Sequence, residues 1–418
     1  MYNQSHNHLD SAKDLDHKDP MAKFRERFHF PKSPGGNGLY FCGHSLGLQP
    51  KDTRLAIETE LDSWAKYGVE GHFEGPYPWL PYHENITKSF SKLVGAKESE
   101  VVAMNTLTVN LHLMMVSFYR PTKTRYKILI ENNTFPSDKY GVDSQARFHG
   151  LDPALTVVEL KPTPGKKTVE PEDVIAQINA LGDSLALVML GNCNYLSGQC
   201  FNFKDIAAAA HKNGAFCGFN LAHGAGNLAM NLHDDEVDFA VWCSYKYLNS
   251  GPGGLAGAFV HEKHFADKKI PRFEGWWGHD KTSRFKMGPT FEPIPTVEAW
   301  QLSNPPIFQL ASLRASMNIF DEAGIGNLRS RGDKLTSYLE FLLKENCEGK
   351  LDIITPKSRG SMLSIQMKKD PKPLVKIFSE KGVMLDFREP DILRVTPAPL
   401  YNSYEDCWRL VQIMKESL

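Results

Sequence analysis

Between residues 101 and 219 the chain alternates short, mostly apolar runs with amphipathic stretches. Such runs are typical of strands that are buried on both faces. Because stretches with helical spacing separate these runs, the sequence predicts a mostly parallel sheet covered by helices on both faces, which is an α/β fold. We expect strands at 101–104, 126–130, 156–160, 185–190 and 215–219, and helices at 171–181 and 203–213.

The chain has 418 residues, which is enough for two or three domains. Residues 1–20 are polar and charged, a composition that favours disorder. We expect residues 67–310 to form the large α/β domain. After residue 310 the pattern changes to amphipathic helices followed by strands, so residues 311–418 are predicted to form a smaller α+β domain that residues 21–66 complete.

Composition excludes several classes of partner. The 48 Lys and Arg residues balance 49 Asp and Glu residues, whereas nucleic-acid binding usually needs a basic excess. No apolar run approaches the roughly 20 residues that span a bilayer, and the N-terminus lacks an apolar signal core. The seven cysteines are dispersed without CxxC spacing, and the histidines do not have the spacing of a zinc site. We therefore expect a cytoplasmic protein with reduced thiols and no metal.

Polar or aromatic residues follow five of the predicted strands. In a parallel sheet covered on both faces, ligands bind beyond the carboxyl ends of the strands, so these residues are expected to meet in one crevice. The segments are Thr106–Thr108, Phe135–Asp138, Gly191–Cys193, Asn220–His223 and Tyr245–Lys246.

Lys246 is the most informative of these residues. It is flanked by Tyr245 and Tyr247, and a glycine-rich run to Gly257 follows it. Large apolar neighbours lower the pKa of an amine by disfavouring its charged form. The pattern is typical of a lysine that binds pyridoxal phosphate (PLP) covalently. Thr108 opens a predicted helix whose first amides can hold a phosphate.

Taken singly, these residues have ordinary structural explanations. Thr108 and Asp138 can be helix caps, and Phe135 can belong to the core. His223 can be a half-buried histidine with a satisfied hydrogen bond, and Arg394 can be a surface charge. Their occurrence together, in this order along the chain, favours the functional interpretation.

The chain resembles the kynureninase family over nearly its whole length. This resemblance implies the fold of fold-type I PLP-dependent enzymes, similar to class V aminotransferases, with a mostly parallel sheet and a smaller α+β domain. The motifs that carry it are Ser45–Pro50 (SLGLQP), Phe135–Asp138 (FPSD), Cys243–Asn249 (CSYKYLN), Gly275–His279 (GWWGH), Arg284–Met287 (RFKM), Ser303–Pro306 (SNPP) and Pro397–Asn402 (PAPLYN).

The resemblance also implies roles for single residues. Lys246 would hold PLP, and Lys246 and Tyr245 would be the catalytic residues. Leu107, Thr108 and Tyr245 would bind the phosphate, and Phe135 would stack on the ring. The other residues expected around the cofactor are Ser137, Asp138, Gly191, Asn220, His223, Trp276 and Asn304.

Substrate contacts are implied in the same way. Arg394 would clamp the α-carboxylate with two hydrogen bonds. Ser45, His72, Trp276 and Asn304 would complete the substrate site, with Trp276 and Asn304 supplied across the interface of a homodimer.

Three positions depart from the family pattern. Asn220 stands where the family has an Asp that pairs with the protonated pyridine nitrogen, and an amide cannot supply that charge. A lost charged hydrogen bond is worth about 1.5–3 kcal/mol, which predicts a slow enzyme unless Asp138 takes over the ring nitrogen. Gly191 stands where a Ser is expected. His44 replaces an Asn, and it either changes substrate selectivity or packs against the aromatic residues at 77–79.

The implied reaction is hydrolysis of L-kynurenine or 3-hydroxy-L-kynurenine to an anthranilate and L-alanine. It belongs to tryptophan catabolism, in the kynurenine pathway that leads to NAD biosynthesis. Two alternatives stay open: a catalytically silent PLP-binding homologue, which Asn220 favours, and another lyase of the same fold such as a cysteine desulfurase. A desulfurase needs a nucleophilic cysteine late in the chain, and Cys347 is the candidate.

Overall fold

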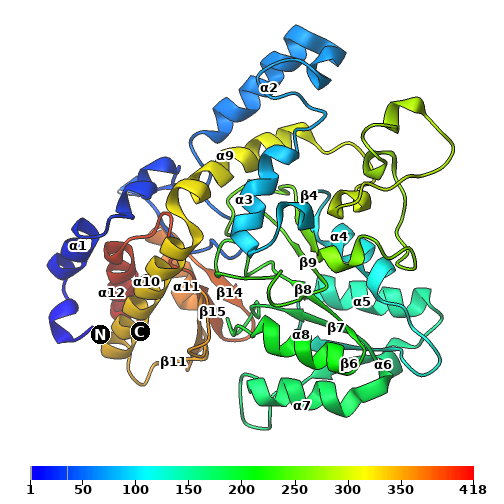
Figure 1. Cartoon of the computed structure of the whole chain (residues 1–418). Coiled ribbons are helices and arrows are strands. Elements are labelled where there is room, and N and C mark those ends of the chain that lie inside the picture. Colours follow the sequence, from blue (N-terminus) through cyan, green and yellow to red (C-terminus); the bar gives the residue numbers. More distant parts are fainter. Residues whose placement is uncertain (1, 35) are drawn as a thin grey trace.

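The computed structural model describes residues 2–34 and 36–418. Its main sheet contains the strands β4 (Val101–Ala103), β5 (Lys127–Glu131), β6 (Val157–Leu160), β7 (Leu185–Gly191), β8 (Phe216–Asn220), β9 (Phe239–Trp242) and β10 (Gly257–Val260). The spatial order is β4-β10-β9-β8-β7-β5-β6. All neighbours pair in parallel except β10, which is antiparallel to both β4 and β9. The predicted mostly parallel α/β fold is confirmed (Figure 1).

Helices cover both faces of this sheet. The helices are α3 (Glu84–Val94), α4 (Leu107–Phe118), α5 (Pro136–Phe148), α6 (Pro153–Thr156), α7 (Pro171–Leu181) and α8 (Phe203–Lys212). Along β7, Val188 and Leu190 join the hydrophobic cluster under α3, α7 and α8, whereas Leu187 and Met189 join the cluster under α4 and α5. Successive side chains of a strand point to opposite faces, so a strand covered on both faces must be apolar throughout.

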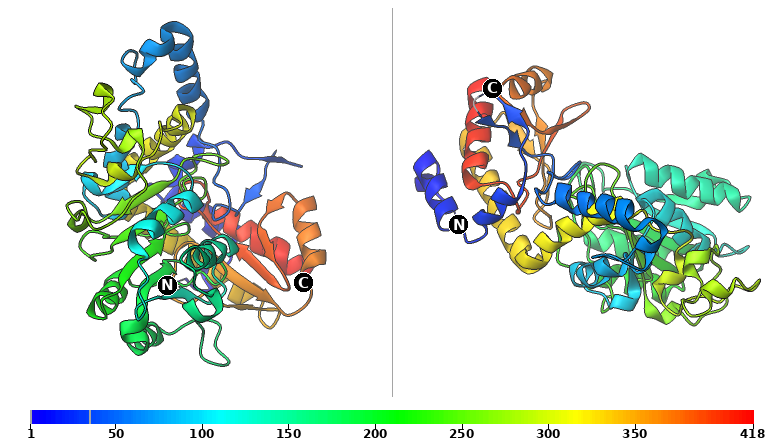
Figure 2. Two further views of the ribbon diagram at one scale, coloured as in Figure 1. Left: turned by 90° about the vertical axis from the view of Figure 1, so that its right-hand side faces the viewer. Right: turned by 90° about the horizontal axis from the view of Figure 1, so that it is seen from above.

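Most of the C-terminal helices and strands form a second layer system beside the large sheet (Figure 2). Its sheet has the order β11-β12-β15-β14 and is antiparallel. The elements are β11 (Leu351–Ile353), β12 (Leu363–Met367), β13 (Val383–Met384), β14 (Asp386–Arg388), β15 (Ile392–Val395), α10 (Ile325–Asn346), α11 (Lys372–Glu380) and α12 (Tyr404–Ser417), and α9 (Ile307–Ala323) precedes α10.

Two hydrophobic cores meet along α10. Leu328 and the buried side chains of α9 belong to a core of the large sheet, whereas Leu335 and later side chains of α10 belong to the core of the small sheet. Helix α9 packs on α2 (Thr53–Tyr67) and α3, which ties it to the large part of the molecule. We therefore move the proposed domain boundary from residue 310 into α10.

The N-terminal segment is ordered, so the expectation of disorder for residues 1–20 is wrong for the described residues. Helix α1 (Leu9–His17) lies along α12, as Figure 2 shows for the blue and red helices. Ala12 is fully buried there, and the Asp16 carboxylate accepts hydrogen bonds from the amides of Tyr404 and Glu405. These contacts join ends of the chain that are far apart in sequence, so local composition could not predict them.

Three short strands belong to the N-terminal segment. Strand β3 (Leu39–Tyr40) pairs in parallel with β13, and β1 (Lys32–Ser33) pairs with β2 (Gly36–Asn37). The loop that follows β3 lies between the two sheets, because Cys42 bridges to Thr396 after β15 and the amide of Gly47 donates to the carbonyl of Tyr245. None of the helices in residues 2–34 and 36–418 has the length and apolar character needed to cross a bilayer.

Candidate active site

A cavity lies beyond the carboxyl ends of β5, β7 and β8, where the sequence placed the crevice. Residues from five segments of the chain meet there. The lining residues that were predicted to bind the cofactor are Leu107, Thr108, Phe135, Ser137, Asp138, Gly191, Asn220, His223, Tyr245 and Lys246.

Lys246 follows β9 and presents its amine to this cavity. Its Nζ lies 3.2 Å from Nε2 of His223 and 5.8 Å from the ring centroid of Phe135. Burial lowers the pKa of Lys246, because the charged ammonium loses hydration. Burial, together with the charge of Lys246, also holds the pKa of His223 well below its ordinary value. A neutral imidazole next to an amine of lowered pKa favours a nucleophilic lysine.

Two helices begin at the cavity. The hydroxyls of Thr108, in the first turn of α4, and Ser137, in the first turn of α5, lie 2.7 Å apart. The first amides of a helix have no partner within the helix, and the helix dipole favours negative charge at that end. These two helix ends with adjacent hydroxyls have the chemistry of a phosphate site.

Asp138 and Asn220 form a buried pair on the floor of the cavity. Nδ2 of Asn220 donates to Oδ2 of Asp138 at 2.7 Å, and Oδ1 of Asn220 accepts from the amide of Ala222 at 2.8 Å. The other carboxylate oxygen of Asp138 is buried without a partner in the described chain. Burial raises the pKa of Asp138 to about 6, against the hydrogen bond from Asn220 and the charge of Lys246. Asn220 therefore positions a carboxylate that still has an oxygen to offer.

Glu131 also lines the cavity, and the sequence did not single it out as a site residue. It is buried, and burial raises its pKa to about 8, although a hydrogen bond from Asn194 acts the other way. A Cβ at position 191 would lie 2.8 Å from Oε1 of Glu131, so the carboxyl group occupies the space of a side chain at Gly191. This contact explains a glycine where a serine was expected. Glu131 could have been predicted to line the cavity, because it is the last residue of β5.

Arg394 lies next to the cavity, on β15. Its guanidinium is buried and paired with Asp386, with Nη2 2.7 Å and Nε 3.2 Å from the carboxylate oxygens. Nη1 donates to the carbonyl of Tyr195 at 2.6 Å. The ring of Tyr195, which lines the cavity, packs edge-to-face on Phe135 at 5.4 Å. Neither Asp386 nor Tyr195 was predicted from the sequence, because only the folded chain brings these residues to Arg394.

The other predicted substrate and interface residues lie outside this cavity. Trp276 is 40% exposed and donates from Nε1 to the carbonyl of Arg284. Asn304 is exposed and lines a neighbouring cavity that shares Thr106 with the first. Ser45 is exposed in the loop after β3, and the ring of His72 packs edge-to-face on Trp79 at 5.3 Å.

His44 is buried beside the site. Its Nδ1 lies 2.8 Å from the hydroxyl of Thr396, and its ring lies 6.4 Å from that of His223. Burial, with the charges of Arg394 and Lys246, holds its pKa well below the ordinary value. His44 therefore packs against the site, and the interpretation that it packs against residues 77–79 is wrong.

Solved structures with the same fold define the class of the molecule. A C-DES mutant with glycine covalently linked to its PLP cofactor superposes with a TM-score of 0.77 at 16% identity, covering 94% of this chain and 99% of that one. The cysteine desulfurase CsdA from Escherichia coli gives 0.76 at 17% identity, covering 95% and 98%. The fold is that of the fold-type I PLP-dependent enzymes.

Sequence comparison identifies the family within this class. The kynureninase C-terminal domain model matches residues 328–414. Kynureninase from Myxococcus xanthus is 56% identical over 97% of this chain and 96% of its own length, and that from Nematostella vectensis is 46% identical over 96% and 92%. The chain belongs to the kynureninase family. The family assigns to this chain PLP as the cofactor and hydrolysis of a carbon–carbon bond of kynurenine as the activity.

The chemical groups that line the cavity match those of PLP. It presents an amine of lowered pKa at Lys246, a buried carboxylate oxygen without a described partner at Asp138, and two helix N-termini with the hydroxyls of Thr108 and Ser137. These groups match an aldehyde, a pyridine nitrogen and a phosphate respectively.

Proposed function

We propose that the chain hydrolyses L-kynurenine and 3-hydroxy-L-kynurenine to anthranilate or 3-hydroxyanthranilate and L-alanine, as a cytoplasmic homodimer in the tryptophan catabolism that leads to NAD. The observation that carries this proposal is the single cavity that contains Lys246, the Asp138–Asn220 pair and the two helix N-termini.

Lys246 and Tyr245 are the proposed catalytic residues. Bound PLP supplies an electron sink for the bond that breaks. The Nζ of Lys246 removes the proton from the substrate Cα, because its lowered pKa leaves the amine able to accept a proton. Burial raises the pKa of Tyr245, so its phenol stays protonated and can donate to the substrate carbonyl oxygen.

Arg394 is the proposed carboxylate site. In the structure its guanidinium is held by Asp386 and by the carbonyl of Tyr195, so two further carboxylate oxygens must share or displace these contacts. A planar guanidinium held on two sides is already oriented for a second carboxylate.

We propose Asp138 as the partner of the pyridine nitrogen. Both ends of the Asn220 amide are engaged, by Asp138 and by the amide of Ala222, whereas one oxygen of Asp138 has no partner among the described residues. The carboxylate that the family carries at position 220 is thus replaced by one that Asn220 positions.

The proposed homodimer completes the substrate site. Trp276 and Asn304 lie away from the cavity of their own chain and are exposed. Trp276 also belongs to an exposed aromatic group with Phe285, at 5.5 Å, and Phe285 in turn contacts Phe73. Large exposed aromatic groups favour an interface.

The desulfurase alternative is not supported. Cys347 is buried in the core of the small sheet, and burial raises the pKa of its thiol to about 11. A buried thiol of raised pKa is a poor nucleophile. The likeness to desulfurases is a likeness of fold alone, at 16–17% identity.

A turnover assay on PLP-loaded protein tests the proposal. Anthranilate fluorescence is followed from L-kynurenine and from the 3-hydroxy substrate, with Lys246→Ala as the control. We expect turnover that Lys246→Ala lowers by on the order of 10⁴-fold or more, since general acid–base catalysis alone contributes up to that factor. A PLP-loaded protein that makes no product from either substrate would replace this proposal with the silent homologue.

Asn220→Asp separates the two explanations of this position. Two carboxylates 2.7 Å apart repel each other, so one of them stays protonated. If Asp138 serves the ring nitrogen, the second carboxylate therefore adds no charge there, and turnover should change by less than about tenfold. A gain of a hundredfold or more would mean that Asn220 had cost the enzyme its charged partner.

A further inference from the structure

Two cysteines face each other across a short hairpin at the wall of the cavity. The hairpin consists of residues 193–200, which follow β7, and Cys193 and Cys200 form an antiparallel bridge at its base. The hairpin turns around Asn194, whose Oδ1 accepts from the amides of Leu196 and Ser197 at 3.0 and 2.8 Å. We call this segment the 193–200 hairpin.

The hydrogen bonds that flank the pair define its geometry. The amide of Asn194 donates to the carbonyl of Gln199 at 2.8 Å, and that of Phe201 donates to the carbonyl of Asn192 at 3.0 Å. Cys193 and Cys200 are therefore a non-hydrogen-bonded pair, whose Cα atoms lie about 4.5 Å apart in antiparallel ladders. That separation lies within the range of about 4.4–6.8 Å that a disulfide spans.

The two thiols already lie side by side. Both are free, and both contact the same acceptor, the carbonyl of Gly198, at 3.6 Å from Cys193 and 3.7 Å from Cys200. The neighbouring thiol of Cys193 is also the largest cause of the raised pKa of Cys200. A bond between the sulfurs needs rotation of side chains rather than movement of the backbone.

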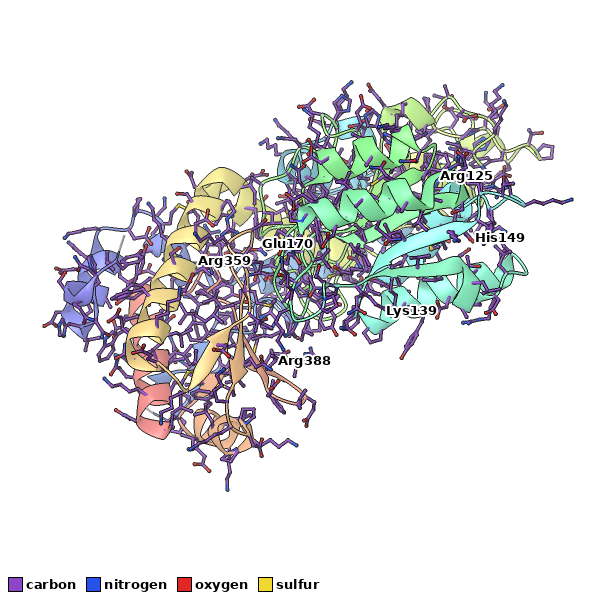
Figure 3. All side chains as sticks on the ribbon, turned by 90° about the horizontal axis from the view of Figure 1, so that it is seen from below. Arg125, Lys139, His149, Glu170, Arg359 and Arg388 are labelled. Atoms are coloured by element: carbon purple, nitrogen blue, oxygen red, sulfur yellow. The ribbon has the colours of Figure 1, made fainter. Side chains whose placement is uncertain are left out.

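The hairpin connects this pair to the site. Cys193 and Tyr195 line the cavity, and the carbonyl of Tyr195 holds Arg394. On its other side the hairpin contacts the connection between β11 and β12: Gln199 bridges to Arg359, which Figure 3 labels, and the amide of Cys200 donates to the carbonyl of Ser358 at 2.9 Å. Other hairpin residues, including Ser197 and Gln199, line a second open cavity. Cys200 is partly exposed, so a small reagent can reach the pair through this residue.

We propose that Cys193 and Cys200 form a dithiol modification site, which a hydroperoxide oxidises to an intramolecular disulfide. One thiolate attacks a peroxide oxygen and becomes a sulfenic acid, with loss of water or an alcohol. The second thiol then attacks that sulfur, the S–S bond forms and water leaves. The two sulfurs are oxidised and the peroxide is reduced. A small thiol reverses the reaction by thiol–disulfide exchange.

The disulfide acts on the site through the hairpin. It removes the contacts of both thiols with the carbonyl of Gly198 and draws the sulfur of Cys193, which lines the cavity, toward Cys200, so the wall of the cavity beside Tyr195 changes. We expect turnover to fall severalfold and to recover on reduction. The contact with Cys193, followed by burial, raises the pKa of Cys200, so oxidation is slow at neutral pH and accelerates as pH rises.

Peptide mapping of PLP-loaded protein after hydrogen peroxide treatment tests the proposal. Free thiols are alkylated and the protein is digested with trypsin, which releases residues 168–204 with both cysteines in one peptide. We expect this peptide to be unalkylated and lighter by two hydrogen atoms, and to become doubly alkylated after treatment with dithiothreitol. Cys347→Ser, which removes a buried cysteine elsewhere, should behave as the unmodified chain does.

Cys200→Ser gives the decisive comparison, because Cys193 lines the cavity and Cys200 does not. We expect this variant to keep its turnover under peroxide while the unmodified chain loses its own. A peptide in which each cysteine is alkylated or oxidised singly would overturn the proposal, as would equal, irreversible loss of turnover in both proteins. The peptide readout does not depend on the proposed substrate, so failure of the proposed function is recognised separately.

Discussion

Asp138 and Asp238 are buried carboxylates that contact opposite ends of strand β8. At the carboxyl end of the strand, Asn220 donates to Asp138, whose second oxygen has no partner in the described parts of the chain. At the amino end, the amide of Cys217 donates to Asp238, which also contacts His211, His264 and Lys263 at 2.8, 2.8 and 3.0 Å. One strand thus connects an incompletely paired carboxylate with a fully paired one.

Their pKa values move in opposite directions. Burial raises the pKa of Asp138 to about 6. Burial acts in the same direction on Asp238, but hydrogen bonds from His211 and His264 and the charge of Lys263 outweigh it and hold the pKa well below the ordinary value. A paired carboxylate stabilises the fold, whereas one with a free oxygen is available to a ligand. The predictions that follow test this division between stability and function.

Asp238→Asn should give the largest effect, on stability. Removing one partner of a buried charge cluster costs about 3–5 kcal/mol, so we expect a loss of that size in urea unfolding at pH 7. A lowered folded pKa means that this stability is present above the ordinary pKa of Asp and is lost as pH falls through the folded value, so the difference should shrink in acid.

Asp183→Asn is the matched control, because the side chain of Asp183 is fully exposed. Turnover per folded molecule should be unchanged in Asp238→Asn. A loss of turnover without a loss of stability would contradict the assignment of Asp238 to the fold.

Asp138→Asn should lower turnover and leave stability unchanged. It removes the proposed partner of the pyridine nitrogen, and a charged hydrogen bond is worth about 1.5–3 kcal/mol, so turnover should fall by about ten- to a hundredfold. Stability should not fall, because burial opposes the charge of Asp138 and an amide oxygen at this position can still accept the hydrogen bond from Asn220. Steady-state kinetics and urea unfolding of the same preparation measure both, and unchanged turnover would return the role to Asn220.

Glu131→Gln should have a smaller effect that depends on pH. Because its folded pKa is raised to about 8, Glu131 contributes stability that is present below its ordinary pKa and is lost as pH rises through about 8. Glutamine does not titrate, so the variant should gain about 3 kcal/mol over the unmodified chain between pH 5 and pH 8. Unfolding of cofactor-free protein at these two pH values measures it, and a pH-independent difference would show that Glu131 is already ionised.

The strands and most of the cavity could be predicted from the sequence because their signals are local. An apolar run predicts a buried strand, and the residue after it is placed at the crevice by the topology of a parallel sheet. Lys246, Asp138 and Thr108 were located in this way, and the structure brings them into one cavity.

The residues that were missed depend on contacts between distant segments. Tyr195 reaches the cavity because its hairpin is held by Arg359 and Ser358 of the small domain. Asp386 and Arg394 pair across neighbouring strands of the small sheet, and Asp16 of α1 accepts a hydrogen bond from the first amide of the last helix. Such pairings follow from the packed fold and leave no periodic pattern in the sequence.

Gly191→Ala should give the smallest effect, and it tests how Glu131 is held. The backbone of Gly191 lies outside the left-handed region, and an added Cβ would lie 2.8 Å from Oε1 of Glu131, so the substitution is opposed by this contact and not by backbone strain. We expect a loss of about 1 kcal/mol, because the end of a side chain can move. In a double-mutant cycle with Glu131→Ala the loss should disappear, giving a coupling of about 0.5–1 kcal/mol.

Gly326→Ala in α10, where no described atom lies within 4 Å of the added Cβ, is the control and should not lose stability. Additive losses in the cycle would show that the glycine is required by a contact other than the one with Glu131.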